Sequence, residues 1–224
     1  MSERVKIILD KNADILRLPA IALRGLVVFP GNIIHFEVGR KKSIAAIEWA
    51  MSNNNAVFLT AQQDMDVEDP GFKDLYAYGV VAEVKQVLRV SDELVKVLVE
   101  GKYRAKLLTL DSSGRFLLAS TKAAALRGTK SVDSARVEAL VRSVKEAFEE
   151  YLSLNPRLSK DVVYTIITNE DAALLCDYIP ANLLLKYTDK QALLNEGTVS
   201  GRLEKLLEIL RRETKILHIE KDIQ

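Results

Sequence analysis

The spacing of apolar residues changes near Gly128, and this change constrains the fold more than any other feature of the 224-residue sequence. Before it, short apolar runs separated by turn residues predict strands, as where Ile34, Phe36 and Val38 alternate with other side chains. After it, apolar residues recur every three or four positions, as on helices that bury one face. This order predicts an α+β protein, with a β-rich part followed by a helical part.

Residues 1–124 are predicted to form a small β-barrel or closed sheet with one helix. Gly101 is expected to end one strand before another begins, and the helix should cover residues 42–52, with Ile44, Ile47 and Met51 on its core face. The predicted strands occupy residues within 15–29, 33–38, 56–60, 80–90, 94–100, 103–110 and 116–123.

Residues 125–224 are predicted to form a helical bundle that ends in a long helix. Ser159 and Asn169 are suited to cap two of its helices, and Pro180 is expected to end the second of these. The last helix should begin near Ser200, and its pattern is still helical at Gln224. We therefore expect the chain to be part of a longer protein, cut within this helix.

The sequence has no pattern that predicts catalysis, a metal or a cofactor. It contains neither a phosphate-binding P-loop nor a dinucleotide-binding glycine motif. His35, His218 and Cys176 are the only residues of their kinds, which are too few for a zinc site. Cys176 is expected to be a buried, inert thiol rather than a nucleophile, and the acidic loop at 64–69 lacks the calcium-loop pattern. We expect this chain not to be an enzyme.

Charge and composition limit the partners and the compartment. Lys and Arg (32) nearly balance Asp and Glu (31), so a net charge of +1 does not predict a nucleic-acid partner. No apolar run approaches the roughly 20 residues that cross a membrane. With one cysteine and no secretion signal, the chain is expected to be cytoplasmic.

Trp49 lies on the predicted helix, almost opposite its core-facing residues. It has two interpretations: packing against a neighbouring loop, or service as an exposed aromatic anchor for another polypeptide. Phe72, Leu75 and Tyr76, beside the acidic loop, could extend such a surface. These four residues are the candidate polypeptide-binding site.

Several separate motifs, in order along almost the whole chain, resemble the N-terminal domain of ATP-dependent Lon proteases. In the second half they are Asp189–Gln191, Leu193-Leu194, Arg202-Leu203 and Leu206-Leu207. In the first half they are Leu18-Pro19, Leu23-Arg24, Val27–Pro30, Val38–Arg40, Ser43–Glu48, Val99–Gly101 and Arg104.

The resemblance implies a PUA-like barrel followed by a helical bundle. It also implies a non-catalytic module that recognises and holds unfolded, damaged or regulatory proteins and aids assembly of a homo-hexamer. The family's ATP, Mg²⁺ and serine-protease residues are expected only in domains outside this chain. The alternative is a stand-alone PUA-like module that binds nucleic acid or serves as a structural oligomerisation unit.

Overall fold

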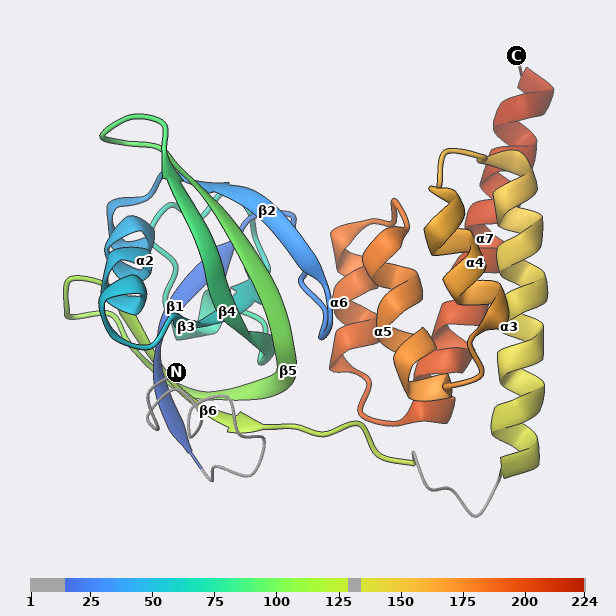
Figure 1. The fold of residues 1–224 in the computed structure, drawn as a ribbon, viewed down its shortest axis with the longest axis horizontal. Coiled ribbons are helices and arrows are strands. Elements are labelled where there is room, and N and C mark those ends of the chain that lie inside the picture. The colour runs from blue at the N-terminus through green and yellow to red at the C-terminus, as the bar shows by residue number, and fades with distance from the viewer. Residues whose placement is uncertain (1–14, 129–133, 224) are drawn as a thin grey trace. The chain divides into compact units, whose positions relative to one another are not determined.

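A computed structural model describes residues 15–128 and 134–223. The chain divides into two compact units, Met1–Ala125 and Leu126–Gln224, the first built on a six-stranded sheet and the second helical (Figure 1). The α+β prediction is confirmed. Within the described residues, no helix combines the length and the hydropathy that a membrane span requires.

The sheet of the first unit closes on itself. Its strands follow the order β2-β5-β4-β3-β1-β6, and β5 pairs additionally with β6. The strands β1, β3, β4, β5 and β6 therefore form a ring, whereas β2 extends from β5 as a sixth strand. This agrees with the predicted small closed sheet. The strands are β1 (Leu16–Leu23), β2 (Ile33–Val38), β3 (Ala56–Ala61), β4 (Tyr78–Arg89), β5 (Val95–Asp111) and β6 (Leu117–Ala123).

The prediction that Gly101 ends a strand is wrong, because β5 runs through it without interruption. Gly101 is needed instead for a close approach between two chain segments. A Cβ atom at this position would lie 2.2 Å from the carbonyl oxygen of Phe29. The same contact holds two backbone hydrogen bonds, since Gly101 accepts from Gly31 at 2.8 Å and donates to Asn32 at 2.9 Å. A glycine is therefore required here by close packing of the two segments, and not by a turn.

Helix α2 (Lys41–Asn53) packs on β1 and β3. Its buried face includes Ile44 and Ile47, as predicted, together with small residues such as Ala46 and Ala50 that let it approach the sheet closely. Met51 does not join this face, because its side chain is 43% exposed and Ala50 takes the last core position of the helix. The part of the prediction that concerns Met51 is wrong.

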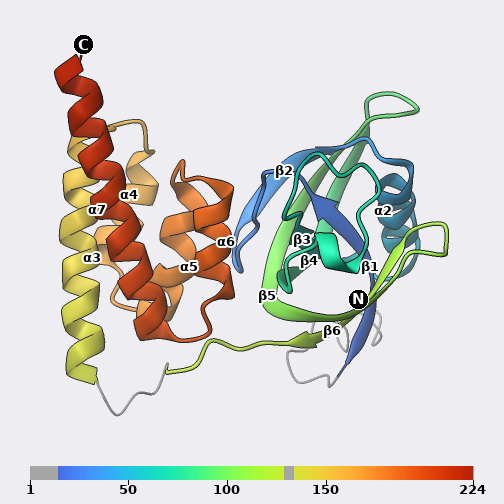
Figure 2. The same cartoon turned by 180° about the vertical axis from the view of Figure 1, so that it is seen from behind.

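The second unit contains α3 (Ser134–Leu154), α4 (Lys160–Thr168), α5 (Ala172–Asn182), α6 (Tyr187–Asn195) and α7 (Val199–Ile223). Figure 2 shows α3 and α7 side by side along most of their length. Ser159 caps α4 as predicted, but Asp171 rather than Asn169 caps α5. Pro180 lies inside α5 and does not end it, although only two residues of the helix follow.

Arg202, in the first turn of α7, is buried within the helical unit, with 1% of its surface exposed. Its guanidinium donates to the carboxylate of Asp177 on α5. It also donates from Nε and Nη2 to the carbonyl oxygen of Glu196, at 3.3 and 2.9 Å. One side chain on α7 thus joins α5 to the residues that follow α6.

Candidate functional site

Trp49 lies on the outer face of α2. Both interpretations of this residue apply, because it packs against a neighbouring loop and also stays partly exposed. Its ring packs against Phe116, in the turn before β6, with ring centroids 5.7 Å apart. It nevertheless remains 38% exposed. The preceding Glu48 binds Arg89 at 2.7 Å and Arg115 at 3.0 Å, which attaches the end of β4 and the turn between β5 and β6 to this face. Trp49 is therefore held in place and still accessible to a partner.

The other three candidate residues differ in their accessibility. Phe72 begins a short 3-10 helix and is 48% exposed, and Tyr76 is half-buried. Leu75 is only 3% exposed and packs in the barrel core. Its proposed place on the surface is therefore wrong, because the chain turns inward after the 3-10 helix and directs this side chain among the strands. Phe72 and Tyr76 remain candidates.

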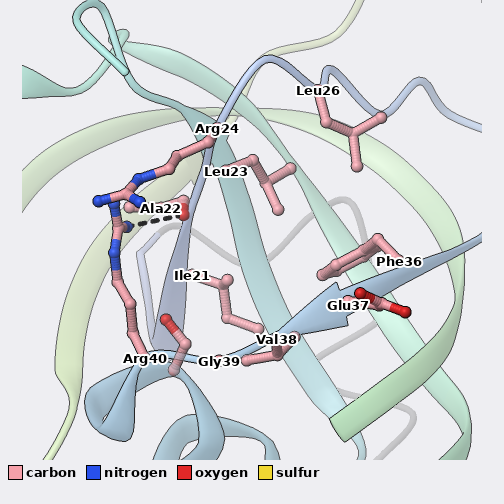
Figure 3. Close-up of a pocket in the computed structure, with 11 residues that line it drawn as sticks. Ile21, Ala22, Leu23, Arg24, Leu26, Phe36, Glu37, Val38, Gly39 and Arg40 are labelled. Carbon is pink, nitrogen blue, oxygen red and sulfur yellow. Dashed lines mark hydrogen bonds between the residues drawn. The ribbon is translucent and has the colours of Figure 1, made fainter. Parts of the chain in front are cut away.

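A hollow of about 590 Å³ lies beside the ends of β1 and β2, where no binding residue was predicted. Its lining comes from residues 21–26 on one side and residues 36–43 on the other. Figure 3 shows the apolar side chains of Leu23, Leu26 and Phe36 around it, with the guanidinium groups of Arg24 and Arg40 together at one end. The hollow offers both apolar surface and positive charge.

Arg40 positions the segments that form this hollow. Its guanidinium donates to the carbonyl oxygen of Ala22 at 3.2 Å, to the side-chain oxygen of Gln62 and to the carbonyl oxygen of Val67 at 3.2 Å. It thus links the end of β1, the end of β3 and the acidic loop. Burial lowers the pKa of Arg40, and the nearby charge of Arg24 lowers it further. The group stays charged at neutral pH, so Arg24 and Arg40 place two positive charges at this end of the hollow, beside the carboxylates of Glu68 and Asp69.

The sequence held a partial signal for this hollow. Leu23-Arg24 and Val38–Arg40 are among the motifs that resemble the Lon family, but the sequence assigned them no binding role. A charged residue inside an apolar motif indicates a specific partner, and here that partner lies in a distant loop. Spacing alone could not identify it.

Cys176, the thiol considered as a nucleophile, belongs to the helical unit. Cys176 is buried on α5, and burial raises the pKa of its thiol to about 12, so the thiolate nucleophile does not form at neutral pH. Across residues 15–128 and 134–223, no three His, Cys, Asp or Glu side chains are grouped so that they could hold a metal ion. The described geometry is suited to binding.

Comparison of the fold with solved structures finds N-terminal domains of Lon proteases. The domain from the Mycobacterium avium complex superposes with a TM-score of 0.70 at 20% identity, covering 88% of this chain and 98% of that one. The domain from Xanthomonas campestris gives a TM-score of 0.56 at 15% identity, covering 86% and 98%. These matches establish the shared fold.

Sequence comparison identifies the family of the chain more specifically than the shared fold does. It is 38% identical to the Lon protease of Desulforamulus reducens over 95% of its own length, and 36% identical to that of Escherichia coli K12 over 96%. It spans 26% and 27% of those two relatives. Residues 17–212 match the family described as the ATP-dependent protease La (LON) substrate-binding domain. Because that match covers most of the sequence, this chain belongs to the Lon substrate-binding domain family.

Proposed function

We propose that this chain recognises and holds unfolded, damaged or regulatory proteins as the N-terminal module of an ATP-dependent Lon-type serine protease. The family match over residues 17–212 carries the proposal. Nucleotide binding and peptide-bond hydrolysis are assigned to other domains of the longer protein, so ATP and Mg²⁺ are not ligands of this module. The cytoplasm is its proposed compartment.

Accessible apolar side chains on a folded unit support this role physically. An unfolded polypeptide exposes the apolar residues that a native protein buries, and exposed aromatic side chains are effective anchors for them. Trp49 and Phe72 are 38% and 48% exposed on the β-rich unit. Each contact is weak, but several copies of the module in the proposed hexamer would raise the effective concentration and the total affinity.

A binding experiment with a matched variant tests this function. The probe is fluorescently labelled, reduced and carboxymethylated α-lactalbumin, which is permanently unfolded, with native α-lactalbumin as the negative control. Anisotropy should show binding of the unfolded probe only. Trp49→Ala should weaken it by about fivefold or more, the effect of losing one aromatic anchor. Met51→Ala, on the same helix and similarly exposed, should change it by less than about twofold.

Melting temperatures provide the control for folding, because Trp49 also packs against Phe116. A Trp49→Ala variant that melts near the wild-type temperature yet binds the unfolded probe with wild-type affinity would remove Trp49 from the site. Absence of any binding by the wild-type chain would refute the proposed function itself.

A further inference from the structure

The outer edge of β2 is available for pairing with another strand. On one side β2 pairs antiparallel with β5, in a register from Ile33 opposite Glu100 to Val38 opposite Val95. On the other side, no described residue forms a strand pair or a recorded backbone hydrogen bond with residues 33–38. In such an edge strand, every second residue directs its N–H and C=O groups sideways, in the plane of the sheet and away from the neighbouring strand. An extended polypeptide can form hydrogen bonds with these groups.

The apolar interior is also incompletely covered along β2. Ile34 and Phe36 lie opposite Val99 and Val97, so all four side chains point to the same face of the sheet. Val97 and Val99 are fully buried, whereas Ile34 and Phe36 are only half-buried. Phe36 also lines the hollow of about 590 Å³, so this uncovered strip is continuous with it. One more strand with apolar side chains would cover both.

Positive charge at the end of this strip favours an acidic group on that strand. Arg24 and Arg40 both direct a guanidinium nitrogen at the carbonyl oxygen of Val67, at 3.4 and 3.2 Å. Arg24 is exposed and, among the residues that the structure describes, donates this one hydrogen bond, so most of its donors are open to a carboxylate. Asp69 and Glu68 are the acidic side chains that act on Arg40, and Asp69 is already paired with Lys42 at 3.0 Å.

We propose that an extended polypeptide segment, carrying apolar side chains and a carboxylate, pairs with the free edge of β2, covers Ile34 and Phe36, and places its carboxylate at Arg24. This inference rests on the proposed function and specifies how the unfolded substrate is held. Backbone pairing explains how one site accepts many sequences, since every polypeptide has the same backbone donors and acceptors. The hollow and Arg24 then favour apolar and acidic segments among them.

Backbone methylation of a bound peptide tests the pairing. Short overlapping peptides from α-lactalbumin are screened against the full chain, and the tightest binder that contains Asp or Glu is made in two forms, N-methylated at alternate residues in either register. Strand pairing predicts that one register loses binding by about 30-fold or more, while the other changes it by less than about threefold, because only one row of N–H groups faces β2.

Charge and packing variants test the rest of the site. Arg24→Gln should weaken the acidic peptide about tenfold but should not further weaken the peptide whose carboxylate is replaced by an amide. Phe36→Ala should weaken both, with the melting temperature measured as a folding control. Arg17→Gln, an exposed arginine at the start of β1, should change neither.

The outcomes separate this inference from the proposed function. If unfolded α-lactalbumin binds but both methylated peptides bind like the parent, or both lose binding equally, pairing with β2 is refuted and the function stands. The same conclusion follows if no short peptide binds. Equal effects of Arg24→Gln on the acidic and amide peptides would refute the carboxylate contact. If the unfolded protein itself does not bind, both proposals fail.

Discussion

Replacement of Arg202 by alanine is expected to destabilise the helical unit strongly. The side chain is 1% exposed, and its removal breaks the ion pair with Asp177 and the hydrogen bonds to the carbonyl oxygen of Glu196. Breaking a buried ion pair by removing one partner lowers the free energy of unfolding by about 3–5 kcal/mol. The side chain of Asp177 is 20% exposed, so water can partly solvate it, which favours the lower end at about 3 kcal/mol.

The double variant Arg202→Met with Asp177→Leu separates two causes of this loss. It removes the carboxylate that has lost its bond to Arg202, but it still leaves the carbonyl oxygen of Glu196 without the donors of Arg202. An unsatisfied buried acceptor lowers stability by about 1–3 kcal/mol. We therefore expect the double variant to be more stable than Arg202→Ala, although less stable than wild type.

Urea unfolding followed by circular dichroism at 222 nm measures these differences, because the second unit contains most of the helix. The matched control is Arg212→Ala on the same helix α7, where the arginine side chain is 45% exposed and pairs with Asp189. An exposed pair of this kind contributes about 1 kcal/mol or less. If Arg202→Ala lowered stability no more than Arg212→Ala, the reasoning that a buried charge organises this unit would be wrong.

Two further predictions concern the barrel. Gly101→Ala should lower the stability of the barrel by about 1–3 kcal/mol or more, because the new Cβ would meet the carbonyl oxygen of Phe29 at 2.2 Å. Urea unfolding followed by tryptophan fluorescence measures this loss. Gly114→Ala is the control and should have a smaller effect, because its Cβ would have an ordinary 3.7 Å contact. Hydrogen bonds from Lys102 and Lys85 hold the pKa of Glu100 below its usual range. Its stabilising contribution is therefore complete above the unfolded pKa of about 4.3 and is lost as the pH falls through the lower folded value. Glu100→Gln should be less stable than wild type at pH 7, and this difference should shrink in unfolding curves recorded at progressively lower pH; a constant difference would contradict the assignment.

Local patterns predicted the elements well where apolar side chains alternate along a strand or a capping residue starts a helix. The alternation at Ile34, Phe36 and Val38 predicted β2, and Ser159 predicted the start of α4. The pattern was misleading at Met51 and Pro180, near the ends of their helices. There the helix geometry is still regular, but the neighbours that decide burial or termination come from other elements.

The candidate site could be predicted only in part. Trp49 was identifiable because helical spacing places it opposite Ile44 and Ile47, independently of any contact. Leu75 was misassigned because it follows an exposed loop, and only the packed barrel shows that its side chain turns inward. The hollow at Arg40 was missed, because residues 21–26 and 36–43 form it only when the chain between them folds back and Arg40 reaches Gln62 and Val67.

The sequence by itself determined the order of a β-rich unit and a helical unit and the family to which they belong, because periodicity and motifs are properties of neighbouring residues. Only the tertiary structure decided that the sheet closes through β5 and β6, that β2 keeps a free edge, and that Arg24 and Arg40 meet at the acidic loop. These features depend on pairing between distant segments. Such pairing arises when the chain packs, and no local pattern encodes it.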